Sequence, residues 1–293
     1  MRVGVVFPQT EIGTDLAVIR DYVQTAEGLG YTHILIFDHV LGADTKNRPG
    51  WRGSYRLTDQ FHEPMVFYGY LAAITKLELV TGVIISPQRQ TALLAKQAAE
   101  VDILTNGHFR LGIGVGWNAV EYESLNENFK NRGRREEEQI EVMRLLWTQP
   151  SISYQGRYHT LPEVGLNPLP VQQPIPIWLG GTSDATYRRV AKMADGWLPQ
   201  FPPFGEGPEI VERVRQYTRE AGRDPAKLGM EARISPRDTN PDEWRRQLDG
   251  WRDLGATHLS INTMGMGLKS PRDHIAAIER VARELDIQPD RQP

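Results

Sequence analysis

The sequence has 293 residues, with 34 lysines and arginines, 37 aspartates and glutamates, a formal net charge of −3 and no cysteine. The lack of cysteine excludes disulfides, thiolate nucleophiles and cysteine-ligated metals, and the near balance of charge gives no sign of binding to nucleic acid or a membrane surface. No apolar run reaches the roughly 18 residues of a membrane span, and no histidine spacing matches a metal site. We therefore expect a cytoplasmic protein that has no metal and binds neither nucleic acid nor a membrane.

Short apolar runs alternate along the chain with amphipathic stretches. The apolar runs predict strands at residues 3–7, 33–37, 77–85, 109–115, 177–179, 197–198, 230–234 and 258–262. The amphipathic stretches predict helices at residues 15–29, 64–74, 91–104, 134–147, 183–194, 208–221, 241–254 and 271–285. Strict alternation favours a parallel sheet with crossover helices, and eight units in a chain of this length favour a closed barrel over an open sheet. The predicted fold is α/β, a (β/α)8 TIM barrel, with residues 1–293 as one domain.

Two segments interrupt this alternation, one after the second strand and one after the fourth strand and its helix. Residues 41–61 form a long polar loop, a length typical of lids and binding loops. Residues 148–176 form the second insertion, in which residues 152–154 and 158–160 flank a Gln-Gly-Arg turn and predict a β-hairpin.

Polar residues at the carboxyl ends of the strands are the first candidates for a site, because barrel enzymes carry their active sites there. The second strand ends in Asp38-His39, an acid beside an imidazole that suits proton donation or binding of a polar ring edge. Alternatively, Asp38 caps the turn and His39 fills space. Gly82, inside the third strand, indicates a bulge or a close approach of a ligand to the backbone.

Alternating glycines follow the fourth strand. Gly112, Gly114 and Gly116 precede Trp117 and would let a ligand approach the backbone closely. The run is not a dinucleotide-binding fingerprint, since Trp117 stands where the third glycine would be. A tight turn beneath Trp117 is the alternative to a binding loop.

The fifth strand runs into Gly180-Gly181-Thr182-Ser183 and then a helix. Free amides at a helix start, room beside glycines and two hydroxyls together suit a phosphate group. Helix capping by Thr182 or Ser183 is the simpler reading, and both can hold at once.

Five motifs in this order resemble the luciferase-like monooxygenase superfamily: Asp38-His39-Val40, Gly82-Val83, residues 112–117, residues 178–183 and Asp195-Gly196-Trp197. Within the superfamily, the Asp-His element and the Gly-Val-Gly-Trp-Asn run resemble the branch of coenzyme F420-dependent oxidoreductases.

The resemblance implies hydride transfer between coenzyme F420, a deazaflavin, and a small organic substrate, in a homodimer. It implies that His39 lies at the reactive face of the ring with Asp38 holding it, and that a cis peptide joins Gly82 and Val83 behind the ring. It also implies that the cofactor phosphate lies near Gly180, Gly181 and Thr182, and that its side chain lies along the turn with Gly114, Gly116 and Trp117.

Three alternatives remain open. An FMN-dependent monooxygenase of the same superfamily would add oxygen activation and a reductase partner. A barrel that binds a ligand without catalysis would be of another class, although retention of Asp38-His39 and the glycines argues against it. A cofactor-free sugar-phosphate lyase or isomerase would want a lysine or glutamate base, whereas strands six to eight offer Gln200, Arg233 and Asn262.

Overall fold

The computed structural model describes residues 1–237 and 240–289. Parallel strands form its centre, in the order β3-β2-β1-β11-β10-β9-β8-β5-β4, and a further pairing of β3 with β5 closes the sheet. Their bounds are β1 (Arg2–Val6), β2 (His33–Ile36), β3 (Glu78–Thr81), β4 (Ile84–Ile85), β5 (Phe109–Gly114), β8 (Ile177–Gly180), β9 (Gly196–Leu198), β10 (Gly229–Ile234) and β11 (His258–Ile261). Since β3 and β4 both pair with β5, they are two parts of one strand, and the predicted (β/α)8 barrel is confirmed.

The third predicted strand is interrupted where the sequence predicted a continuous run over residues 77–85. Gly82 and Val83 separate β3 from β4, and the peptide bond between them is cis, as the resemblance implied. Glycine is required at the break, because a Cβ on Gly82 would lie 2.4 Å from Cδ2 of Leu35.

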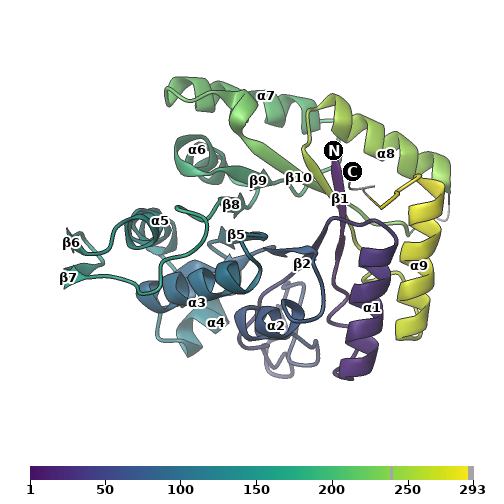
Figure 1. The fold of residues 1–293 in the computed structure, drawn as a ribbon, viewed down its shortest axis with the longest axis horizontal. Helices are drawn as coiled ribbons and strands as arrows, with labels where there is room; N and C mark the ends of the chain where they lie inside the picture. The colour runs from purple at the N-terminus through teal and green to yellow at the C-terminus, as the bar shows by residue number, and fades with distance from the viewer. Residues whose placement is uncertain (238–239, 290–293) are drawn as a thin grey trace.

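Helices surround the barrel (Figure 1). They are α1 (Leu16–Gly28), α2 (Pro64–Leu71), α3 (Thr91–Leu104), α4 (Ala119–Ser124), α5 (Arg132–Thr148), α6 (Asp184–Met193), α7 (Gly207–Glu220), α8 (Pro241–Asp253) and α9 (Pro271–Glu284). Eight match the predicted helices. The short helix α4 was not predicted, because six residues are too few to show a helical period. Among the described residues, no helix is both long and apolar enough to cross a membrane.

The predicted hairpin in the second insertion is confirmed. Strands β6 (Ile152–Gln155) and β7 (Thr160–Val164) pair antiparallel and lie beside α5, outside the barrel (Figure 1). Glu138 of α5 holds the turn, since its carboxylate accepts hydrogen bonds from the amides of Arg157, Tyr158 and His159. The first insertion, residues 41–61, contains no helix or strand.

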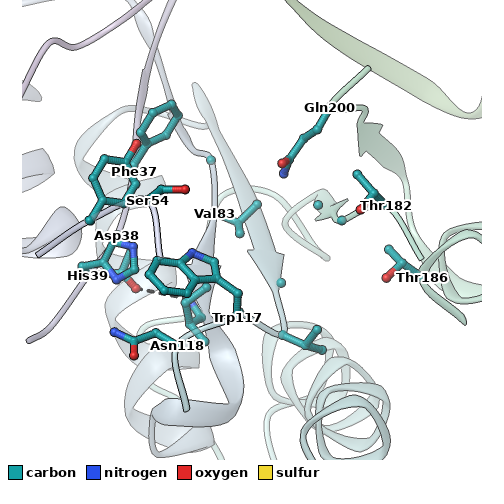
Figure 2. Close-up of a pocket in the computed structure, with 18 of the residues that line it drawn as sticks. Phe37, Asp38, His39, Ser54, Val83, Trp117, Asn118, Thr182, Thr186 and Gln200 are labelled. Carbon is teal, nitrogen blue, oxygen red and sulfur yellow. Dashed lines mark hydrogen bonds between the residues drawn. The ribbon is translucent and has the colours of Figure 1, made fainter. Parts of the chain in front are cut away.

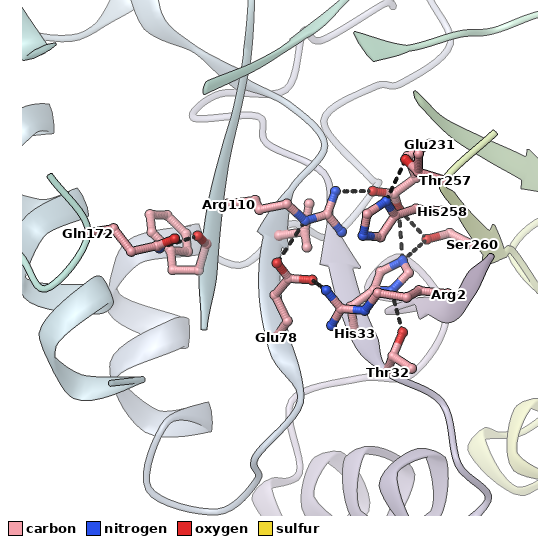
Figure 3. A network of polar contacts seen from close by, with 12 residues as sticks. Arg2, Thr32, His33, Glu78, Arg110, Gln172, Glu231, Thr257, His258 and Ser260 are labelled. Atoms are coloured by element: carbon pink, nitrogen blue, oxygen red, sulfur yellow. Dashed lines mark hydrogen bonds and ion pairs between the residues drawn. The ribbon is translucent and has the colours of Figure 1, made fainter. Parts of the chain in front are cut away.

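A buried charge network fills the amino-terminal half of the barrel (Figure 3). Arg110 of β5 donates hydrogen bonds to Glu78 of β3 at 2.9 Å and to Glu231 of β10 at 2.8 Å. The other oxygen of Glu231 lies 3.0 Å from Nε2 of His33 and accepts a bond of 2.6 Å from Ser260. Buried charges are tolerated when they are paired and hydrogen-bonded, and these pairs occupy this half of the interior, so the open space lies at the other end.

His258 lies beside this network and makes the stability of the protein depend on pH. Burial and the charge of Arg110 lower the pKa of His258 to about 3, below its ordinary value of 6.5. The unfolded chain therefore takes up a proton as the pH falls through about 6.5 while the folded protein does not, and stability is lost on acidification.

We expect His258→Gln to lose this contribution. Between about pH 6.5 and 4.5, the free energy of unfolding of the variant should fall by about 2 kcal/mol less than that of the wild type, as measured by urea unfolding. His108→Gln, which changes an exposed histidine, is the control. Equal pH dependence of wild type and His258→Gln would show that His258 takes up its proton in the folded state as well.

Candidate active site

A cavity of about 660 Å³ opens at the carboxyl ends of the barrel strands (Figure 2). All ten predicted site residues line it: Asp38, His39, Gly82, Val83, Gly114, Gly116, Trp117, Gly180, Gly181 and Thr182. They lie at the ends of β5 and β8 or in the segments that follow β2, β3, β5 and β8. The fold therefore brings together residues that the sequence places up to 144 positions apart, from Asp38 to Thr182 (182 − 38).

Val83 forms a ledge in the middle of the cavity. Its side chain fits between Gly114 and Gly180: a Cβ on Gly114 would lie 2.8 Å from Cγ2 of Val83, and a Cβ on Gly180 would lie 2.9 Å from Cγ1. Figure 2 shows Val83 between His39 and Trp117 on one side and Thr182 and Gln200 on the other. The two glycines thus leave room for the side chain of Val83 in the cavity.

His39 is held by Glu121, a residue of α4 that sequence reasoning missed. Nδ1 of His39 lies 3.0 Å from Oε2 of Glu121, while Oε1 accepts hydrogen bonds from the amides of Val40 at 2.6 Å and Leu41 at 3.1 Å. Burial opposes ionisation of Glu121, but the bonds from His39, Leu41 and Val40 keep its pKa below the usual range. An ionised Glu121 fixes the proton on Nδ1, which leaves Nε2 to accept or donate a proton; Nε2 has no hydrogen-bond partner in the described part of the chain.

The expectation that Asp38 holds His39 is wrong. The Asp38 carboxylate accepts hydrogen bonds from Arg89 at 2.7 Å and from the amide of Ile85 at 3.2 Å. Consecutive side chains of an extended segment point in opposite directions, so Asp38 and His39 cannot easily meet. Asp38 instead fixes β4 behind the ledge of Val83.

Aromatic side chains surround His39. Its ring packs edge-on against Tyr55 at 5.2 Å, Phe61 at 4.8 Å and Trp117 at 5.6 Å between ring centres. Tyr55 and Phe61 belong to the loop of residues 41–61, so this insertion forms one wall of the cavity.

The hydroxyl groups of Thr182, Ser183 and Thr186 lie together at the start of α6, across the cavity from His39. Ser183 caps the helix, with its Oγ accepting from the amide of Thr186 and lying 3.0 Å from Oγ1 of that residue. Gly181 has a φ of +132°, and a Cβ there would lie 3.0 Å from Thr186 Oγ1, so only glycine leaves this corner open. Capping by Ser183 is therefore present, and Gly181 and Thr182 beside it line the cavity as a seat whose amides and hydroxyl would suit a phosphate.

Several cavity residues were not singled out as site residues from the sequence: Gln88, Glu121, Thr186, Arg233 and Ser235. Glu121 carried a weak signal, since Asn118 three positions before it caps α4. Both amide atoms of Gln88 and the hydroxyl of Ser235 are buried without a hydrogen-bond partner in the described chain. Within the described residues, no group of three or more histidines and carboxylates could hold a metal ion.

Known proteins share this architecture. The sequence profile of the luciferase-like monooxygenase family matches residues 1–286. The chain is 32% identical over 223 residues to the uncharacterized protein Rv0940c of Mycobacterium tuberculosis, and this match covers 74% of this chain and 77% of that protein. It is 27% identical over 245 residues to the FMNH2-dependent dimethylsulfone monooxygenase of Pseudomonas fluorescens, and this match covers 82% of this chain and 63% of that enzyme.

Among solved structures, the coenzyme F420-dependent tetrahydromethanopterin reductase of Methanopyrus kandleri has the same fold, with a TM-score of 0.74 at 16% identity over 97% of both chains. The closed parallel barrel makes this chain a (β/α)8-barrel protein, with its cavity at the carboxyl ends of the strands, where barrel enzymes have their active sites. More narrowly, the chain belongs to the luciferase-like monooxygenase family, as its motifs suggested. FMN-dependent and F420-dependent enzymes both occur among its relatives and structural neighbours.

Glu121 should contribute measurably to stability as well as to the site. We expect Glu121→Gln to lower the free energy of unfolding by about 1–3 kcal/mol, because a buried carboxylate that accepts four hydrogen bonds, from His39, Val40, Leu41 and Asn118, is replaced by a neutral amide that has to donate with one end. Urea unfolding at neutral pH measures the loss.

Glu123→Gln is the matched control, since Glu123 is exposed on the same helix. A Glu121→Gln variant as stable as this control would show that the contacts to His39, Val40 and Leu41 are not maintained in solution.

Proposed function

We propose that this protein is a coenzyme F420-dependent oxidoreductase that acts on a small organic substrate. The observation that carries the proposal is the seat at the start of α6, which offers hydroxyls and amides but no cation. Among the described residues that line the cavity, the one with a cationic side chain is Arg233, which lies against Phe37 and not at the seat.

The charge of the phosphate decides between the two cofactors of the family. FMN ends in a phosphate monoester, which carries a charge of about −1.5 to −2 at neutral pH. Coenzyme F420 carries a phosphodiester at the corresponding position, with a single negative charge. A seat without a cation stabilises one partly buried charge more readily than two, which favours the deazaflavin.

The cavity also fits the ring. The ledge of Val83, kept clear by Gly114 and Gly180, gives a planar ring an apolar support between the phosphate seat and His39. Bound in this way, the deazaflavin would supply the hydride chemistry. Nε2 of His39 would exchange a proton with the substrate while Glu121 keeps the imidazole oriented, and Asp38 would hold β4 in place behind the ledge.

FMN-dependent monooxygenation is the second candidate, and the dimethylsulfone monooxygenase relative supports it. It would require a reductase partner to supply reduced flavin. The same ledge and seat would serve it, but the monoester would lack a cation at the seat.

Titration of the purified protein with coenzyme F420 and with FMN, followed by ring fluorescence, tests the proposal. We expect coenzyme F420 to bind at least about ten times more tightly than FMN, because the doubly charged monoester has no cation at the seat. Tighter binding of FMN would support the two-component monooxygenase, and binding of neither would support a barrel without catalytic function.

The Gly180→Ala variant, titrated in the same way, tests whether the cofactor ring rests on Val83. The added methyl group would displace Val83, so binding should weaken about tenfold or more. Gly28→Ala is the control, since a Cβ there meets no atom within 4 Å. Unchanged cofactor binding by Gly180→Ala would show that the ring does not rest on Val83.

The homodimer implied by the family remains a proposal, supported by an apolar outer surface on two adjoining helices. Val66 of α2 is 73% exposed and Leu93 of α3 is 57% exposed. We expect sedimentation velocity to give a mass near twice the 33.2 kDa of the chain, and Val66→Glu with Leu93→Glu to shift it toward the monomer. A monomeric wild type would contradict the dimer.

A further inference from the structure

We infer that the substrate is a small carboxylic acid with an apolar body, and that Arg233 binds its carboxylate. The inference rests on the proposed function in one respect, namely that this cavity is the active site. It goes further by naming the chemical class of the substrate and the residue that selects it.

Arg233 is a partly buried cation without a counterion. It forms no hydrogen bond or ion pair with any described residue, and its accessible surface faces the cavity. Burial lowers the pKa of Arg233, and the charges of Tyr55 and Glu231 oppose this shift only in part. Glu231, however, is already engaged by Arg110, His33 and Ser260. An isolated charge in such a place is costly unless a ligand neutralises it.

The position of the guanidinium identifies it as a ligand-binding group. Arg233 comes from β10, yet its Cζ lies 5.1 Å from the centre of the Phe37 ring at the end of β2. Strands β11 and β1 separate β10 from β2 in the sheet, so the side chain extends across the middle of the barrel mouth. A residue that only stabilised its own strand would not need to reach there.

A second unpaired polar atom lies on the same side of the strand. Ser235 follows Arg233 by two positions, which places both side chains on one face of β10 and its extension. The Ser235 hydroxyl is buried, lines the cavity and has no hydrogen-bond partner in the described chain. Arg233 and Ser235 together offer a forked cation and a hydroxyl donor, which suit the two oxygens of a carboxylate.

The surroundings limit the rest of the substrate. Phe37 and Tyr55 line the cavity close to Arg233 and belong to one apolar cluster with Phe61 and Val83. One cation balances one negative charge, so a monoanion fits better than a phosphate monoester. A carboxylate on Arg233 would direct an apolar body over these rings toward His39 and Val83.

Paired acids and amides test the inference, since each pair differs in charge and hardly in shape. Binding of benzoate and benzamide, and of cyclohexanecarboxylate and its amide, is measured by titration calorimetry with the protein saturated with coenzyme F420 and again without cofactor. We expect at least one acid to bind about tenfold or more tightly than its amide. Arg233→Gln should remove this preference, and Arg233→Lys should keep part of it.

Arg246→Gln, an exposed arginine on the outer face of α8, is the matched control and should keep the full preference. Equal binding of acids and amides by the wild type, no binding of either, or a preference that survives Arg233→Gln would overturn the inference.

A separate fluorescence titration of Arg233→Gln with coenzyme F420 distinguishes the two proposals. Unchanged cofactor affinity is expected; a loss as large as the loss of acid preference would assign Arg233 to the cofactor and overturn the substrate inference. Cofactor binding without acid preference would refute this inference alone. Acid preference in a protein that binds neither cofactor would refute the proposed function alone.

Discussion

The ion pair between Arg110 and Glu231 is the contact on which the division of the barrel into two halves depends. It joins β5 to β10 at 2.8 Å across the interior, although β8 and β9 lie between them in the sheet. Through Glu231 the network also includes His33 of β2 and Ser260 of β11. Removing one partner of such a buried pair leaves an uncompensated buried charge, which strongly destabilises the folded state. The interior of this half is filled, and the cavity with the candidate site residues opens at the carboxyl ends of the strands.

Above this network, backbone shape decides what the cavity can bind. Val83 is a common apolar residue, and it becomes a ledge only because Gly114 and Gly180 carry no side chains. These glycines could be found in the sequence, since each lies at the end of a strand and the strand ends of a parallel barrel meet at one mouth. The periodic pattern likewise predicted the eight strands and their helices. Local composition and the rules of parallel sheets were sufficient for both, without knowledge of side-chain contacts.

The partners of individual side chains were beyond that reasoning. Asp38 and His39 are neighbours in sequence, but an extended backbone turns their side chains apart, so Asp38 contacts Arg89 and His39 contacts Glu121. Glu121 lies 82 positions away on a helix too short to show a helical period. Arg233 was visible as a strand-end residue, but its lack of a counterion is a property of the packed barrel. A sequence pattern predicts which segments meet, whereas charge pairing depends on which atoms of those segments meet.

The distribution of charge in the cavity follows a simple rule with one exception. The two carboxylates that line it are each matched, Asp38 by Arg89 and Glu121 by His39, and the seat at α6 is built from neutral groups. Among the described residues that line the cavity, Arg233 has a charge without a counterion, and it lies against the ring of Phe37. Two anionic ligands would therefore be held at separate places, one by amides and hydroxyls and one by the guanidinium. Their uncharged parts would then meet over Val83 beside Nε2 of His39, which is where a proton can be exchanged.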